Sequence, residues 1–194
     1  MSDLGSHDND VVFFALDIRQ PLTVEAMSPM GKAHPELAPA TMTATYEFPA
    51  RGSAPPVKLV WHQGESRPPQ YHEGKIPKND RAQLFIGDKG MIFCGNGAPQ
   101  LLPEAQFKDY PTPPETLPRS PGHWNEWILA CKGLGPAPGS NFQYSGWTTE
   151  SNHLGNVAYR TGKKIEWDYV KMRAKNAPEA DKYLHYDYRS GWTL

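Results

Sequence analysis

The residues best suited to chemistry lie in the first ten positions of the chain. Asp3, His7 and Asp10 are spaced i, i+4 and i+7, so a helix beginning here would carry them as one polar stripe. A carboxylate one turn from an imidazole orients the ring and favours its protonated form, and the free pKa of histidine is about 6.5. Such a pair can act as general acid or base on a hydroxyl or carbonyl. Spacing alone leaves a structural alternative open, in which the aspartate is a helix cap.

A second pair of candidates, Arg119 and His123, flanks a predicted helix start. Ser120 suits the cap position and Pro121 the first helical position. Arg119 could hold a carboxylate or phosphate with two N–H donors, and helix starts favour anions. The alternative is equally open: both side chains could anchor a loop through hydrogen bonds.

The pattern of elements predicts an α+β fold, a mostly antiparallel open sheet with helices packed on one face, because strands and helices do not alternate regularly. We expect a largely buried helix over residues 8–18, ended by Pro21. The expected strands are 24–27, 41–48, 57–62, the hairpin 83–86 with 91–94, and 165–168; the expected helical segments are 104–107, 120–133, 146–160 and a short one from Pro178.

Some of the expected core residues are tryptophans and cysteines. Trp124, Trp127 and Cys131 fall on one face of the helix predicted over residues 120–133, so we expect that face to be buried. Trp61 and Trp167 are expected in the core of their strands. Cys94 and Cys131 are expected to be buried reduced thiols, with a disulfide left open.

Bulk composition excludes several function classes. A chain of 194 residues is long enough for one domain, and we treat residues 1–194 as a single one. Its 20 basic and 21 acidic residues are nearly balanced and scattered, so no nucleic-acid partner is expected. The longest apolar run is far shorter than a membrane span, so no membrane partner is expected. We find no metal site, because no third ligand lies near His7 and Asp10.

The order of many short motifs resembles the carboxy-terminal domain of the Gfo/Idh/MocA oxidoreductases. The resemblance begins with Asp3-Leu4-Gly5-Ser6-His7 followed by Asp10, and it continues almost to the end of the chain. Further matching strings are Tyr46-Glu47-Phe48-Pro49-Ala50-Arg51-Gly52, Leu84-Phe85-Ile86-Gly87-Asp88-Lys89-Gly90, Leu117-Pro118-Arg119-Ser120-Pro121-Gly122-His123, Leu154-Gly155-Asn156-Val157-Ala158, Ile165-Glu166-Trp167-Asp168 and Tyr188-Arg189-Ser190-Gly191-Trp192.

This resemblance implies the substrate-side domain of an NAD- or NADP-dependent oxidoreductase that acts on a sugar or polyol. His7 and Asp3 match the family's residues that handle the proton accompanying the hydride or anchor substrate hydroxyls. Asp10 matches a further family position, either structural or in contact with substrate. The family also implies a homo-oligomer formed through the open face of the sheet.

The nucleotide-binding half expected from the family is not found in the sequence. The family's glycine-rich turn and its catalytic lysine would lie upstream of the matched region, so we expect a chain truncated at its amino-terminal edge, with a missing Rossmann domain. Residues 95–99 contain two glycines, but a proline follows and no helix is expected to open there. By itself the chain is therefore expected to bind no cofactor and to be inactive. The compartment, cytoplasmic or periplasmic, stays open.

Two alternatives for the whole protein remain. A member of the family can oxidise a sugar transiently, so that a glycosidic bond is cleaved or water eliminated without net redox change. The chain could instead be a non-catalytic binding or assembly module.

Overall fold

The computed structural model describes residues 1, 3–31, 33–34 and 36–192. These residues form two compact units: unit 1 comprises residues 1–72 and 148–194, and unit 2 comprises residues 73–147. Both units combine helices with antiparallel sheet, which confirms the α+β class. The single substrate-binding domain expected from the sequence stays a prediction. No helix in the described ranges is long and apolar enough to cross a membrane.

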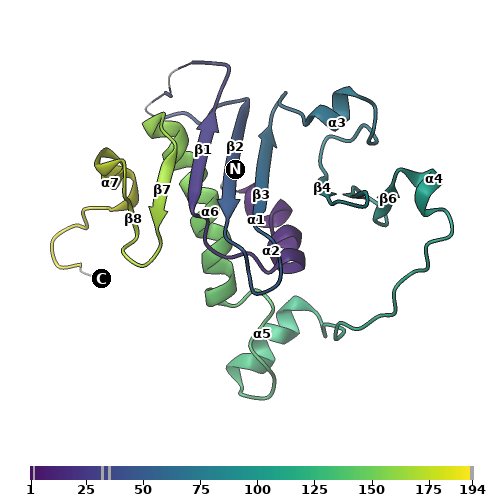
Figure 1. Cartoon of the computed structure of the whole chain (residues 1–194). Coiled ribbons are helices and arrows are strands. Elements are labelled where there is room, and N and C mark those ends of the chain that lie inside the picture. The colour runs from purple at the N-terminus through teal and green to yellow at the C-terminus, as the bar shows by residue number, and fades with distance from the viewer. Residues whose placement is uncertain (2, 32, 35, 193–194) are drawn as a thin grey trace. The chain divides into compact units, whose positions relative to one another are not determined.

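Unit 1 is built on a five-stranded sheet with the order β3-β2-β1-β7-β8, in which all neighbouring strands are antiparallel (Figure 1). The first three strands follow one another in sequence, and β7 joins the other edge of β1. Their bounds are β1 Thr23–Met27, β2 Met42–Phe48, β3 Val57–Gln63, β7 Ile165–Asp168 and β8 Arg173–Ala174.

The alternation along β2 separates the two faces of this sheet. Met42, Ala44, Tyr46 and Phe48 are each at most 1% exposed, whereas Glu47 between the last two is exposed. Threonines occupy the alternate positions of β2, where a β-branched polar residue suits a partly solvated face. The strand predicted over residues 41–48 is therefore confirmed, and one face of the sheet is the core.

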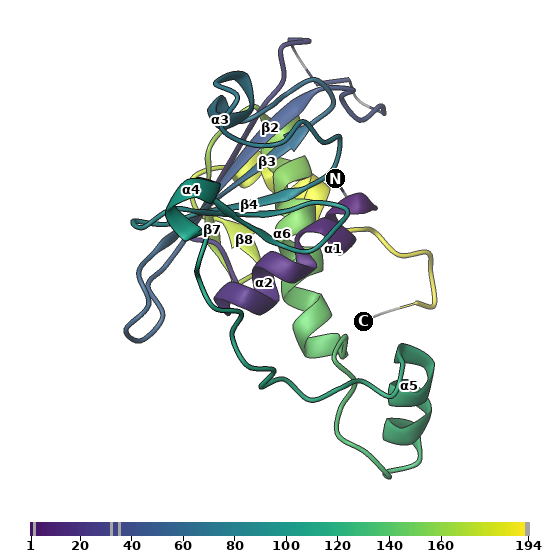
Figure 2. The same ribbon diagram turned by 90° about the vertical axis from the view of Figure 1, so that its right-hand side faces the viewer.

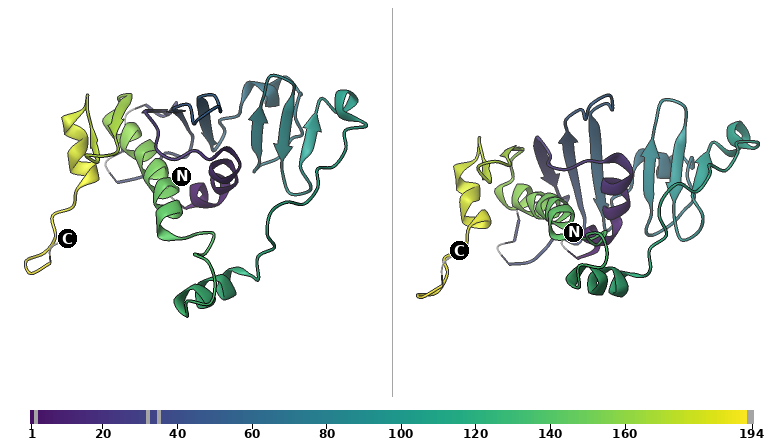
Figure 3. Two further views of the ribbon diagram at one scale, coloured as in Figure 1. Left: turned by 60° about the horizontal axis from the view of Figure 1, so that its bottom comes forward. Right: turned by 90° about the horizontal axis from the view of Figure 1, so that it is seen from below.

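Three helices cover the apolar face: α1 Leu4–Asp8, α2 Asp10–Leu16 and α6 Phe142–Thr161, of which residues from 148 onward belong to unit 1. Figures 2 and 3 show α2 and α6 on the same side of the strands. Phe13 of α2 meets Phe48 of β2 edge to face, with ring centroids 5.7 Å apart. Leu154 and Val157 of α6 are buried as well.

The helix predicted over residues 8–18 differs from the structure. The helical segment begins at Leu4, is interrupted at Asn9 and ends at Leu16, because Asp17 adopts a left-handed conformation with φ 46°. The remaining helical elements of unit 1 are α3 Pro69–His72, the 3-10 turn η1 Pro178–Ala180 and α7 Asp181–Leu184.

Unit 2 contains a three-stranded antiparallel sheet with the order β4-β5-β6. Its elements are β4 Gln83–Ile86, β5 Met91–Cys94, β6 Gln100–Leu102, α4 Glu104–Phe107 and α5 His123–Cys131. The β4–β5 hairpin and α4 confirm the predictions, whereas β6 was not predicted. A long extended segment separates α4 from α5 (Figure 1).

The prediction that α5 buries one face is wrong for the described structure. Trp124 is 71% exposed and Trp127 is 60% exposed. Helical spacing gathers apolar side chains on one face, but only a packing partner removes that face from water. Cys131 is exposed for the same reason, and Cys94 is partly exposed, so both thiols are free but neither is buried. In unit 1, Trp167 is 3% exposed as predicted, while Trp61 is only half-buried.

The contact between α2 and the sheet gives a stability prediction with a neighbouring control. Phe13→Ala removes a ring that is 1% exposed, and we expect a loss of about 3–5 kcal/mol in the free energy of unfolding. Phe14→Ala, at a side chain 62% exposed, should change it by less than about 1 kcal/mol. Urea unfolding followed by circular dichroism measures both. Equal losses for the two variants would contradict this packing.

Candidate functional site

The candidate site is the exposed side of α1 and α2. Asp3, which precedes α1, and Asn9, which lies between α1 and α2, both have helical backbone angles. The segment from Asp3 to Leu16 is therefore an almost continuous helix. At about 100° per residue, Asp3, His7 and Asp10 fall on one side, and all three are exposed. The polar stripe predicted from the spacing is thus present on the surface. We call these three residues the α1 stripe.

The opposite side of the same helices packs against α6. Gly5 and Asn9 are buried there, one turn apart. Asn9 Nδ2 donates a hydrogen bond to Asn152 Oδ1 at 2.9 Å, and both amides are buried. Because the anchored side is diametrically opposite the α1 stripe, this bond determines which side chains face outward.

Gly5 allows the close approach of α1 to α6. A Cβ atom built at Gly5 would lie 2.8 Å from Asn152 Oδ1 and 2.9 Å from its Cγ. Contacts this short do not occur at real Cβ atoms, so a larger residue would push Asn152 away from Asn9. The glycine that follows Leu4 in the matched motif therefore has a packing role in this structure.

Asp3 and His7 do not contact each other in the structure. Within the described ranges, no hydrogen bond or ion pair joins the two side chains; Ser6 Oγ donates to the backbone oxygen of Asp3 at 2.7 Å. The backbone places them one turn apart on the surface. The catalytic roles expected for both stay predictions.

Arg119 and His123 lie in unit 2, close to the start of α5. The helix begins at His123, two residues later than predicted, and Gly122 precedes it with φ 100°. Ser120 Oγ does not cap α5; it accepts the N–H of Gly122 at 3.0 Å and donates to the carboxylate of Glu126. Arg119 forms two 2.6 Å hydrogen bonds with the Glu115 carboxylate.

The Nη2 group of Arg119 is thus paired with the carboxylate of Glu115 on the surface. His123 packs against the ring of Trp124, with centroids 4.7 Å apart. These contacts match the loop-anchoring alternative, and the substrate-binding roles of Arg119 and His123 remain predictions.

Sequence reasoning assigned nothing to His62, which lies in a hydrogen-bonded cluster on the other face of the sheet. Its Nδ1 atom is 2.8 Å from Ser66 Oγ, and Ser66 Oγ is 2.6 Å from Thr43 Oγ1. Burial, and next the charge of Arg67, lower the pKa of His62. Thr43 and His62 are cross-strand neighbours, but the position of Ser66 in the following loop has no periodic pattern that could reveal it.

Glu150 is a second residue to which the sequence reasoning assigned no role. It lies on α6 one turn before Leu154 and accepts a hydrogen bond of 2.5 Å from Trp167 Nε1. Burial raises the pKa of Glu150, and the bond from Trp167 partly opposes this shift. Its partner lies on β7, 17 residues along the chain, so no local spacing in the sequence identifies it.

Among the described residues, no three His, Cys, Asp or Glu side chains gather to hold a metal ion. The two glycines of residues 95–99 lie between β5 and β6, which are two antiparallel strands. A dinucleotide's phosphates bind where a glycine-rich turn leads from a strand into a helix. This loop therefore does not fit the phosphates of a dinucleotide.

No protein-family model and no curated protein matches the chain. Among solved structures, the chain is similar to one described as "the putative dehydrogenase from Bordetella bronchiseptica RB50", with 14% sequence identity and a TM-score of 0.48. The match covers 85% of this chain and 54% of that one, so the chain spans about half the length of its structural neighbour.

Gly5→Ala tests the close approach that orients the α1 stripe. We expect it to lower the free energy of unfolding by about 1–3 kcal/mol, because Asn152 must move and leave buried amide groups unpaired. The control is Gly146→Ala in α6, where a Cβ meets nothing within 4 Å. There the removal of a helical glycine should stabilise by about 0.5–1 kcal/mol. Denaturant unfolding of both variants measures the difference, and a neutral Gly5→Ala would refute the tight contact.

Glu150→Gln tests the buried carboxyl group. Since burial raises the folded-state pKa of Glu150, its contribution to stability is fully present below the ordinary value of 4.5 and is lost as the pH rises through the raised value. The glutamine keeps the acceptor for Trp167 Nε1 and does not ionise. We expect the melting temperature of the variant to rise relative to wild type between pH 4.5 and pH 8. A constant difference across this range would contradict the raised pKa.

Proposed function

We propose that this chain is the substrate-side part of an NAD(P)-dependent oxidoreductase that acts on a sugar or polyol. The proposal rests on the ordered motifs of the sequence that resemble the Gfo/Idh/MocA family. The observation that carries it is the exposure of Asp3 and His7 on the side of α1 opposite its buried, hydrogen-bonded anchor. Two residues matched to catalytic positions are thus available to a substrate.

The role we assign to His7 is proton transfer. In this class of reaction nicotinamide exchanges a hydride with a carbinol carbon, and the hydroxyl proton needs an acceptor. His7 takes that proton as general base, or returns it in the reverse direction. Asp3 orients the imidazole and stabilises its charged form once the substrate brings the two side chains together. Asp10 completes the polar stripe and binds a substrate hydroxyl.

In this proposal a second domain or subunit supplies the nucleotide site, because the glycines of residues 95–99 do not lead from a strand into a helix. Apolar side chains beside the α1 stripe support such a partner: Leu4 is 48% exposed, Val11 39% and Phe14 62%. Exposed apolar residues grouped on one helix surface are typical of a face covered by another structure. In this proposal the partner covers α1 and α2 and encloses the substrate between them.

The uncovered face of the unit 1 sheet is the surface we propose for self-association. It carries Thr23, Glu25 and Met27 of β1, and their neighbours on β2 and β3. Met27 is 65% exposed there. Glu47 of β2 also lies on this face. It accepts hydrogen bonds from Thr23 Oγ1 at 2.6 Å and from Lys164 Nζ at 3.2 Å. The positive charge of Lys164 offsets the negative charge of Glu47, which would otherwise oppose contact between two copies.

The test is turnover by the gene product as it occurs in the cell, with any nucleotide-binding domain encoded within or beside it. Reduction of NAD⁺ or NADP⁺ with a panel of sugars and polyols is followed at the absorbance of the reduced nicotinamide. We expect His7→Ala to lower kcat by about 10²–10⁴-fold, the contribution of a positioned acid–base group. His153→Ala, at an exposed histidine of α6 outside the α1 stripe, should leave kcat unchanged.

The outcomes separate the alternatives. Bond cleavage or dehydration without net NADH formation would replace the dehydrogenase with a transient-oxidation enzyme at the same site. Full activity of His7→Ala would refute the catalytic role of His7. Micromolar binding of NADH by the 194-residue chain alone, measured by nicotinamide fluorescence, would show that the nucleotide site lies in this chain and would refute the need for a partner domain.

A further inference from the structure

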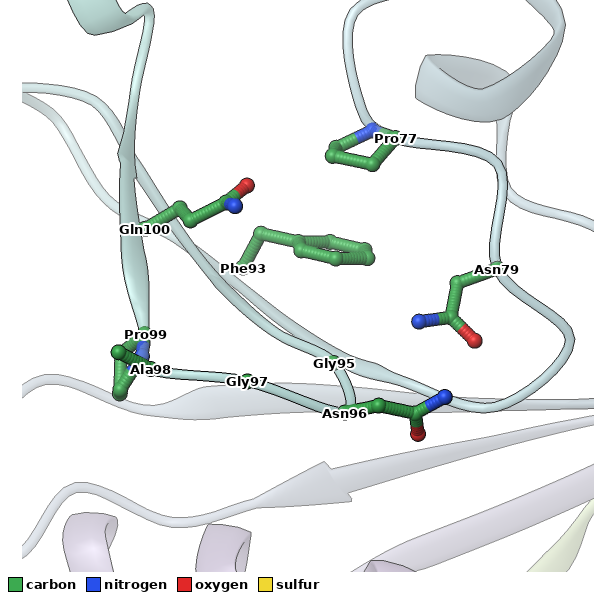
Figure 4. Close-up of a pocket in the computed structure, with 9 residues that line it drawn as sticks. All are labelled: Pro77, Asn79, Phe93, Gly95, Asn96, Gly97, Ala98, Pro99 and Gln100. Carbon is green, nitrogen blue, oxygen red and sulfur yellow. The ribbon is translucent and has the colours of Figure 1, made fainter.

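A hollow in unit 2 lies beside the three-stranded sheet, and none of the residues assigned above lines it. Its volume is about 410 Å³, and Figure 4 shows it between the loop that joins β5 to β6 and the segment before β4. Pockets that take small ligands occupy roughly 300–1,000 Å³. The lining residues are Pro77, Asn79, Phe93, Gly95, Asn96, Gly97, Ala98, Pro99 and Gln100. We call this feature the amide hollow.

The inner wall of the amide hollow is apolar. Phe93 of β5 is 5% exposed, and its ring projects among the other lining residues (Figure 4). Gln100 of β6 is its cross-strand partner, so the amide of Gln100 and the ring of Phe93 lie on the same face of the sheet. Pro77 and Pro99 border the hollow. Because the proline ring fixes φ, the backbone at these two positions loses little conformational entropy when a ligand binds.

Gly95 brings the side chain of Asn79 against this ring. A Cβ atom at Gly95 would lie 2.7 Å from Asn79 Nδ2 and 3.0 Å from Phe93 Cε1. Asn79 Oδ1 accepts the backbone N–H of Arg81 at 3.2 Å, which fixes the amide and leaves Nδ2 on the side of the ring (Figure 4). The hollow therefore combines a held amide donor with an apolar surface.

Two further amides remain available for a ligand. Among the described residues, the side chains of Asn96 and Gln100 have no hydrogen-bond partner. Each amide offers two donor hydrogens and a carbonyl acceptor, a set that suits neighbouring hydroxyl groups, which both donate and accept. No charged side chain lines the hollow, so an ionic ligand would find no opposite charge there.

We propose that the amide hollow binds a neutral, polyhydroxylated ring, that is, one monosaccharide unit of a carbohydrate. The C–H face of the ring lies toward Pro77 and Pro99, since Phe93 is almost fully buried, and its hydroxyls bond the amides of Asn79, Asn96 and Gln100. This site uses none of the residues of the α1 stripe. It stands whether or not the oxidoreductase function holds, and it would bind a sugar unit without acting on it.

The experiment titrates the isotope-labelled 194-residue chain with methyl β-D-glucopyranoside and records backbone amide shifts. We expect a dissociation constant on the order of 1 mM, as for a small ligand with a few neutral hydrogen bonds. The shifted resonances should belong to residues 77–79 and 93–100. Methyl β-D-glucuronide, which has the same ring with a carboxylate, should bind more weakly. Adenosine tests a neutral nucleoside as the occupant.

The matched variants are Gln100→Ala and Gln143→Ala. Both remove an exposed amide from unit 2, but only Gln100 lines the hollow. Loss of one neutral hydrogen bond should weaken binding about fivefold in Gln100→Ala and leave Gln143→Ala at the wild-type value. An amide spectrum of each variant that matches wild type outside the hollow establishes that the fold is intact.

Three results would overturn the proposal: no shift at 100 mM sugar, shifts confined to other residues, or tighter binding of adenosine or the glucuronide than of the neutral sugar. Equal affinity of Gln100→Ala and Gln143→Ala would also overturn it, because the amide assigned to the sugar would then make no contact. None of these results bears on the activity assay of His7, so the two proposals fail separately.

Discussion

The buried amide–amide bond between Asn9 and Asn152 is the constraint on which the candidate site depends. Its 2.9 Å length requires α1 to approach α6 within the space that Gly5 leaves free. Leaving a buried amide without a hydrogen-bond partner lowers the free energy of unfolding by more than the bond itself contributes. The Asn9–Asn152 bond therefore favours one rotation of α1 about its own axis. That rotation turns Asp3 and His7 outward.

The same helix pair leaves polar atoms on α6 without protein partners. Thr148 Oγ1, Ser151 Oγ and Asn152 Nδ2 are buried and form no hydrogen bond within the described structure. They lie on successive turns of the helix face that packs in unit 1, where Gly155 also admits the Tyr46 hydroxyl group at close range. Burial raises the pKa of Tyr46, so this phenol stays neutral within the core. The core beneath the α1 stripe therefore contains polar groups as well as apolar ones.

The two faces of the unit 1 sheet differ in chemistry for a physical reason. Met42, Ala44, Tyr46 and Phe48 exclude water because three helices cover them. The opposite face carries threonines and charged residues. It also carries the His62–Ser66–Thr43 cluster, whose side chains form hydrogen bonds with one another. A face of this kind tolerates both solvent and a polar contact with another subunit.

Local patterns in the sequence were sufficient to predict many of the helices and strands. These patterns predicted β2, the β4–β5 hairpin and most of α6. Each of these depends on neighbours within one turn or one strand, which is why sequence alone determined them. The i, i+4, i+7 spacing of the α1 stripe belongs to the same group.

Only the tertiary structure decided which of these side chains are buried and which partners they contact. The apolar stripe of α5 is exposed, Arg119 pairs with Glu115, and Glu150 is partly buried against Trp167. None of these outcomes follows from periodicity, because burial and charge pairing require a second element that the sequence does not place. By itself the sequence determined which residues could form the stripe; the close contact at Gly5 decided that the stripe lies on the surface, since helix rotation is set by packing and not by spacing.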